Sequence, residues 1–206
     1  VNALLVRDIL GSAGHSYSIH SANAAGGTKV TLPFVTNNFN NTYATRFTVA
    51  NTGTTTACIS VQYAFVDGRP SVTDSPTGQG GCTNGYAIPV TGQVAFAPTT
   101  VDGALAMLAS TAGAMMAAPI TASSGTITVG ADAYYTNGNR GLASYDGFVV
   151  GDSAANSDLG TTILIPIAIK EDGYFSQILL SNPNNTAANA TINYLDQNTG
   201  QHYTVN

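Results

Sequence analysis

The chain has few charged residues, a single glutamate and no tryptophan, and each shortage argues against a class of function. Charged residues make up 8% of the sequence, against about 25% in ordinary globular proteins. A nucleic-acid-binding surface needs clustered Lys and Arg, so nucleic acid is not an expected partner. Glu171 is the only glutamate, which excludes a catalytic pair of glutamates, and the lack of tryptophan removes a common aromatic platform for sugars.

Long apolar runs are also missing. No stretch reaches the roughly 18 apolar residues that a membrane-spanning helix needs, so we do not expect membrane insertion. The net charge of −5 is small for 206 residues, and a weakly charged surface permits copies of the chain to associate. No signal peptide is visible and the sequence starts at Val1. We therefore expect a mature chain after signal removal, located at the cell surface or outside the cell.

The sequence motifs of catalysis and metal binding are absent. There is no Gly-x-Ser-x-Gly elbow, no phosphate loop and no His-Glu-x-x-His motif. No carboxylate or thiol pattern accompanies the histidines, which we interpret as surface residues. The oxygen-rich segment 152–158 lacks the EF-hand spacing, so a solvated linker is favoured over a calcium site. We predict no enzymatic activity and no cofactor. The histidines are His15, His20 and His202.

The two cysteines suggest a disulfide. Cys58 lies in a strand-like run and Cys82 in a Gly-rich loop. A disulfide between them would contribute roughly 3 kcal/mol by restricting the unfolded chain. Two unpaired thiols are the alternative, but the composition is typical of a secreted protein and favours the bond.

Strand patterns dominate the sequence. Apolar and polar residues alternate over 57–65, 127–135 and 188–194, which predicts half-buried antiparallel strands. Turn pairs such as Asn84-Gly85 separate these runs. The exception is 100–118, which is rich in Ala, Leu and Met and is followed by Pro119. That pattern predicts one short helix packed on a sheet.

An internal repeat determines the expected domain organisation. Residues 45–51 and 57–63 match 176–182 and 188–194, so that residues 51 and 182, like 63 and 194, are 131 positions apart. The beginning of the chain resembles the end of the same unit: Val1 to Val6 match Val129 to Tyr134 at an offset of 128. Repeats are informative because each unit folds alike and packs on its neighbours.

We therefore predict an all-β protein built as an antiparallel β-sandwich, Ig-like or jelly-roll-like. Residues 28–150 form one complete module. Residues 151–206 begin a second module without a counterpart of 76–128. Residues 1–27 supply an N-terminal strand and linker. Because one copy of the repeat is split between the two ends of the chain, its sheet must be completed either by the same chain folding back or by a neighbouring chain.

The motifs of the complete module resemble the sandwich repeats of secreted bacterial surface and fibre proteins. The likeness is carried by Leu32-Pro33, Asn51-Thr52-Gly53, Val61-Gln62-Tyr63 and the run 141–148. The second copy departs from it, with Asn182-Pro183-Asn184 in place of Asn-Thr-Gly. The resemblance implies a surface location and a stalk, adhesin or fibre role.

The hypothesis that follows is a head-to-tail homopolymer, in which the N-terminal strand of one subunit completes the second module of the next. An open sheet edge leaves backbone groups unpaired, and an added strand pairs them. The predicted assembly strand comprises Val1, Ala3, Leu4, Leu5, Val6 and Ile9. The predicted acceptor residues are Ile178, Leu180, Ala190, Ile192 and Tyr194.

Two alternatives remain open at the level of sequence. The first is a monomeric adhesin or stalk whose N-terminal strand completes its own second module. The second is a glycan-binding module that uses exposed tyrosines in place of tryptophan. Three Asn-x-Thr triplets, at Asn40, Asn184 and Asn189, are possible glycosylation sites.

Overall fold

The computed structural model has an all-β fold, which confirms the predicted class. Apart from a 3-10 turn at Ala109–Thr111, the regular elements of the described residues are strands. None of these residues forms a helix with the length and apolar content to cross a membrane. The structure describes residues 3–11, 14–22, 26–100, 103–136, 142–151, 159–165, 170–171, 174–175, 178–184, 186–196 and 198–205.

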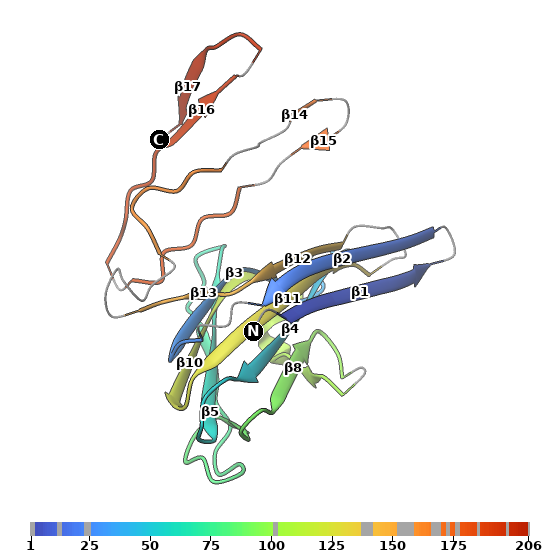
Figure 1. Ribbon diagram of the computed structural model, residues 1–206, viewed down its shortest axis with the longest axis vertical. Helices are drawn as coiled ribbons and strands as arrows, with labels where there is room; N and C mark the ends of the chain where they lie inside the picture. The colour runs from blue at the N-terminus through green and yellow to red at the C-terminus, as the bar shows by residue number, and fades with distance from the viewer. Residues whose placement is uncertain are drawn as a thin grey trace.

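Two sheets lie face to face and form a two-sheet body, residues 27–150 (Figure 1). The first sheet has the order β13 (Phe148–Val149), β3 (Lys29–Thr36), β10 (Met115–Ser124), β5 (Ala57–Phe65), β6 (Val72–Asp74), and β7 (Tyr86–Ile88) also pairs with β5. The second has the order β12 (Leu142–Asp146), β11 (Ile127–Tyr135), β4 (Tyr43–Asn51), β8 (Gln93–Ala97), β9 (Leu105–Ala106). Paired strands are antiparallel except β8 and β9, which are parallel.

The core lies between the sheets and follows the predicted alternation. In β5 the side chains of Ile59, Val61 and Tyr63 are fully buried while the residues between them are more accessible. From the opposite sheet, Phe47 of β4 stacks on Phe96 of β8 with 4.9 Å between ring centroids. Each buried side chain of this size stabilises the fold by about 1.5–3 kcal/mol relative to exposure.

The predicted helix at 100–118 is wrong. Its described residues form β9, the short 3-10 turn and the start of β10. Gly103 and Gly113 adopt φ angles of 74° and 73°, which break a right-handed helix on both sides of the turn. In β10 the small and apolar residues alternate between buried and partly buried, because this strand lies between β3 and β5 and faces the core.

Pro119 lies inside β10 rather than after a helix. The register between β10 and β3 shifts between Met116 and Ala118. Such a bulge accommodates a residue that cannot donate a ladder hydrogen bond.

The chain crosses from one sheet to the other at Gly147. This residue follows β12 in the second sheet and precedes β13 in the first, and its N–H donates to the Val129 carbonyl at 2.8 Å. A Cβ atom here would lie 2.5 Å from a methyl group of Val30. Only glycine therefore lets the chain pass between the sheets without displacing the core.

The disulfide predicted between Cys58 and Cys82 is formed, with 5.6 Å between the Cα atoms. It fixes the loop between β6 and β7 against β5. Since β7 already pairs with β5 through Cys58 and Ala87, the bond joins two elements that the sheet also brings together.

The two ends of the chain form small hairpins outside the body. At the N-terminus β1 (Ala3–Gly11) pairs with β2 (Gly14–Ala22), and β2 lies beside β12 of the body (Figure 1). At the C-terminus β14 (Lys170–Glu171) pairs with β15 (Tyr174–Phe175), and β16 (Ile192–Leu195) pairs with β17 (His202–Val205). No residue whose burial is described in the C-terminal segment, 159–205, is buried.

Candidate assembly site

The C-terminal segment repeats the β5–β6 pairing of the body residue by residue. In the body, β5 pairs with β6 through Val61 and Asp74 and through Tyr63 and Val72. In the C-terminal segment, β16 pairs with β17 through Ile192 and Val205 and through Tyr194 and Tyr203. Every partner is displaced by the same 131 positions that the sequence repeat gives. The structural repeat thus extends to the counterpart of β6, which the sequence comparison missed.

A side-chain turn is repeated at the same offset. Asn51 Nδ2 donates to the Thr55 carbonyl at 2.8 Å, and its Oδ1 accepts from the Gly53 N–H at 2.9 Å. Asn182 makes the equivalent bonds, to the Thr186 carbonyl at 2.7 Å and from the Asn184 N–H at 3.1 Å. The replacement of Asn-Thr-Gly by Asn-Pro-Asn therefore leaves the turn intact.

The two asparagines differ in what surrounds them. Asn51 is 4% exposed and donates further to the carbonyls of Ile88 and Pro89, at 2.9 and 3.2 Å. These bonds attach the end of β4 to the strand that follows the disulfide loop. Asn182 is exposed, and the described residues 159–205 contain no counterpart of Ile88. The turn forms locally, whereas its burial depends on distant parts of the module.

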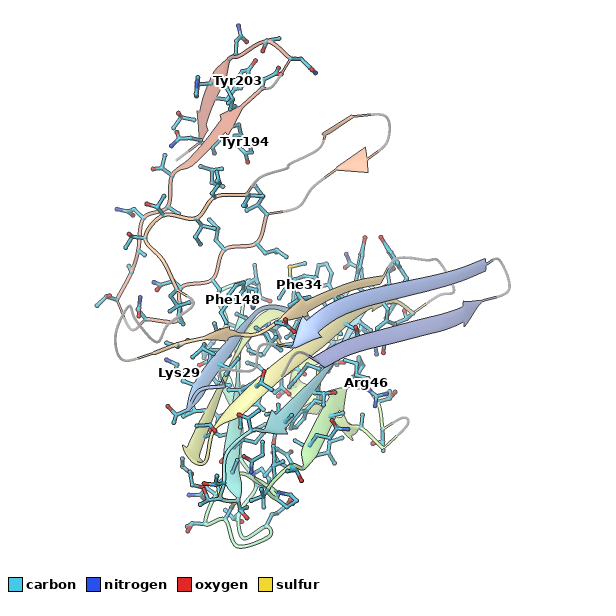
Figure 2. All side chains as sticks on the ribbon, viewed as in Figure 1. Lys29, Phe34, Arg46, Phe148, Tyr194 and Tyr203 are labelled. Atoms are coloured by element: carbon cyan, nitrogen blue, oxygen red, sulfur yellow. A yellow bond between two sulfur atoms is a disulfide. The ribbon has the colours of Figure 1, made fainter. Side chains whose placement is uncertain are left out.

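Core positions of the body are exposed in the second copy. Val49 is fully buried, whereas its counterpart Leu180 is 56% exposed; Tyr63 is fully buried, whereas Tyr194 is 36% exposed. Figure 2 shows Tyr194 and Tyr203 on the hairpin β16–β17, away from the body. The other core residues with exposed counterparts are Leu32 (Ile165), Ala57 (Ala188) and Ile59 (Ala190), and those with partly buried counterparts are Phe47 (Ile178) and Val61 (Ile192).

Missing neighbours explain this exposure. In the body, β10 lies between β3 and β5, while β11 and β8 flank β4. The described part of 159–205 holds counterparts of β4, β5, β6 and part of β3, and none of β7 to β13. The predicted acceptor residues therefore present apolar side chains without a covering sheet.

The predicted assembly strand is part of a hairpin. Ala3, Leu4, Leu5, Val6 and Ile9 lie in β1, whose nine residues all pair with β2; Val1 lies outside the described residues. Among the described strands, β1 pairs with none of the C-terminal strands. These strands therefore do not show a second module completed by the N-terminal strand of the same chain. The single strand predicted for 1–10 is therefore one strand of a pair, as its match to β11 of the hairpin β11–β12 indicates.

The remaining sequence-predicted sites are dispersed. Asn40, Asn184 and Asn189 are all exposed, and their glycosylation stays a prediction. His202 lies on exposed β17, and the side chains of the other two histidines are outside the described set. The segment 152–158 is likewise outside it. Within the described part of the chain, no three His, Cys, Asp or Glu side chains come close enough to hold a metal ion.

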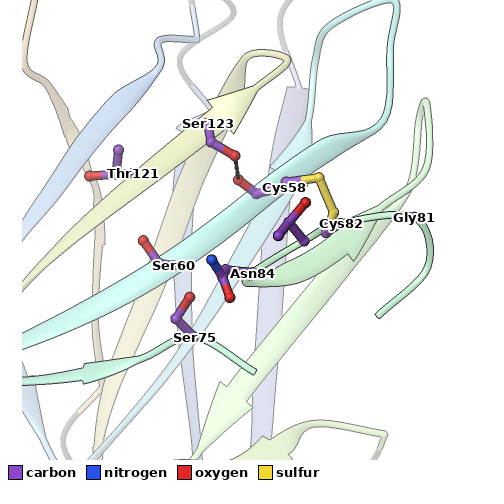
Figure 3. A pocket seen from close by; sticks show the side chains of 9 residues that line it. Cys58, Ser60, Ser75, Gly81, Cys82, Asn84, Thr121 and Ser123 are labelled. Carbon is purple, nitrogen blue, oxygen red and sulfur yellow. Dashed lines mark hydrogen bonds between the residues drawn. A yellow bond between two sulfur atoms is a disulfide. The ribbon is translucent and has the colours of Figure 1, made fainter. Parts of the chain in front are cut away.

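A shallow groove lies beside the disulfide (Figure 3). Its lining carries hydroxyl and amide groups and no Asp, Glu, His, Lys or Arg side chain, so it offers no proton-transfer group. The lining residues are Cys58, Ser60, Ser75, Gly81, Cys82, Thr83, Asn84, Thr121 and Ser123.

One buried carboxyl group lies at the rim of the core. Asp74 is 6% exposed, accepts a hydrogen bond from the Tyr86 hydroxyl at 2.9 Å through Oδ1, and has no partner for Oδ2 among the described atoms. Burial raises the pKa of Asp74, and the Tyr86 hydrogen bond opposes this only in part. Desolvation, then the nearby Asp74, raises the pKa of Tyr63. The cluster sits inside the complete module, away from the acceptor residues.

Comparisons with protein-family models, curated proteins and solved structures find no match for this chain.

The two asparagine turns give a matched pair of variants. Asn51→Ala removes the donor for the Ile88 carbonyl, and we expect the free energy of unfolding to fall by about 1–3 kcal/mol. Asn182→Ala, at an exposed turn, should change it by less than about 0.5 kcal/mol. Urea denaturation followed by tyrosine circular dichroism measures both. Equal effects of the two substitutions would contradict the difference in burial.

Asp74 should make stability depend on pH. Because its pKa is raised on folding, the folded state binds the proton more tightly than the unfolded state, and stability falls as pH rises from the ordinary value of 3.8 through the folded pKa. Asp74→Asn should remove this fall in urea denaturation between pH 3.5 and 7. Asp67→Asn, at an exposed carboxylate whose pKa Arg69 lowers, is the control and should leave the fall in place. Parallel pH profiles for wild type and Asp74→Asn would refute this role.

Proposed function

We propose that the chain is a structural subunit of an extracellular filament or pilus-like fibre, and that subunits join head to tail by β-strand complementation. The observation that carries the proposal is the exposure of Leu180, Tyr194 and their neighbours at positions that are core in the two-sheet body. The partner is a second copy of this chain. No catalysis, cofactor or nucleic acid is part of the proposal.

The exposed apolar side chains supply the driving force. They are concentrated in the C-terminal segment, and large exposed apolar patches are typical of interaction sites. An added strand would cover part of this surface and supply backbone hydrogen-bond partners along the sheet edge, which is β-augmentation. The large ones are Ile163, Leu164, Ile165, Leu179, Leu180, Tyr194, Leu195, Tyr203 and Val205.

Head-to-tail contact produces a filament unless the rotation between subunits closes a ring. The low charge of the chain reduces repulsion between subunits. The disulfide Cys58–Cys82 fits an oxidising compartment. The resemblance of the module to bacterial surface repeats points to the same location.

A monomeric adhesin or stalk is the second candidate, since the N-terminal hairpin lies beside β12 of its own body. If that placement persists in solution, the C-terminal residues would serve contacts other than self-assembly. The molar mass of the purified chain separates the two candidates.

Removal of residues 1–22 tests the proposal. We expect the shortened chain to keep its disulfide and its sheet circular dichroism, because the two-sheet body is intact, but to form no filaments in negative-stain microscopy. Added wild-type chain should bind the shortened chain at its free C-terminal segment, whereas shortened chains alone should stay monomeric in light scattering. Filaments of normal length from the shortened chain would refute strand complementation.

A further inference from the structure

We propose that the donated element is the whole N-terminal hairpin of a second copy, and that β1 takes the place of β11, with Ala3 opposite Ile178 of the neighbour. This inference rests on the proposed function and specifies its geometry. It follows from a pairing that the two-sheet body already contains.

The template is the pairing of β11 with β4. These strands pair over nine residues, with Ala131 opposite Phe47. Ile127, Val129 and Ala131 of β11 are buried, so this strand extends the core beside β4 in the same sheet. The counterpart of β4 in the second copy is 174–182, and in the described part of the C-terminal segment nothing takes the place of β11 beside it.

The N-terminal hairpin has the form of the element that is missing. Both β1–β2 and β11–β12 are antiparallel pairs, and Ala3 to Arg7 of β1 match Ala131 to Tyr135 of β11 at an offset of 128. The registers within the two hairpins differ, since Tyr17 lies opposite Asp8 where its counterpart Tyr145 lies opposite Ala131. Each pair precedes a Gly-Thr dipeptide, Gly27-Thr28 or Gly160-Thr161, and then an apolar residue before proline, Leu32-Pro33 or Ile165-Pro166. In the body β12 follows β11 as the outer strand, so β2 would follow β1 at the same edge.

The register follows from the two offsets. Ala131 corresponds to Ala3, and Phe47 corresponds to Ile178, so the pair of Ala131 with Phe47 becomes Ala3 with Ile178. On the same rule the pair of Tyr134 with Ala44 becomes Val6 with Phe175. The buried position 131 and the partly buried position 133 of β11 translate to Ala3 and Leu5. A slip of one residue would turn Leu4 toward the core and Ala3 away from it.

The same register explains why the residues at the contact between subunits are apolar. The donor positions Ala3 and Leu5 are apolar, and so are the acceptor positions Ile178, which is partly buried, and Leu180, which is 56% exposed. No charged residue falls on either set. The contact between subunits is therefore stabilised by the burial of apolar side chains, and assembly should depend little on salt concentration.

Cysteine cross-linking between two separately purified variants tests the register. Ala3→Cys chains are mixed with Ile178→Cys chains, assembled and oxidised; Leu4→Cys mixed with Ile178→Cys is the slipped control. We expect the matched mixture to give about tenfold more covalent dimer than the control on a non-reducing gel, since a disulfide needs Cα atoms within about 7 Å. Microscopy of each mixture reports whether filaments form.

The outcomes distinguish a failure of the proposed register from a failure of the proposed function. Filaments with more cross-linking in the slipped control, or with none in either mixture, would overturn the register and leave strand complementation standing. Absence of filaments from wild-type chain would overturn the proposed function itself. In a chain carrying both Ala3→Cys and Ile178→Cys, an intramolecular disulfide in the monomer would show self-completion and overturn both.

Discussion

A strand with an apolar face is stable only when a second sheet covers that face and neighbouring strands pair its backbone. In the two-sheet body this condition is met for β4, which has β11 and β8 beside it and β5 across the core. The sequence counterpart of this strand, 174–182, has no such neighbours among the described residues. Its inward residue Leu180 is 56% exposed where Val49 is fully buried. The exposure of apolar side chains in the second copy, and the assembly proposed from it, follow from this contrast.

The repeat separates local from non-local determinants of structure. The Asn51 and Asn182 turns and the β5–β6 and β16–β17 hairpins form alike, since each depends on contacts within about a dozen residues. Burial does not recur, because it requires strands that lie 50 or more positions away in the sequence, such as β10 and β11 for β5 and β4. Antiparallel hairpins need only a turn, but a sandwich core needs many strands at once.

Much of the fold could be predicted from the sequence, and the errors have physical causes. Period-two alternation identified β5 and β11, and the cysteine spacing suggested the disulfide. The helix expected at 100–118 failed because packing between β3 and β5 overrides the helix propensity of the Ala and Met residues. Within the candidate site, the repeat located Leu180 and Tyr194. The match of the first residues to β11 pointed to a hairpin, but the pairing of 3–11 with 14–22 has a register that the repeat does not give.

Backbone amide hydrogen exchange compared between residues 47–64 and 178–195 tests the central claim directly. In dispersed chains the account predicts strong protection for 47–64 and nearly unprotected exchange for 178–195, because no described strand covers the second copy. In assembled filaments 178–195 should become protected as well. Equal protection of both segments in the dispersed chain, or continued rapid exchange of 178–195 after assembly, would contradict it.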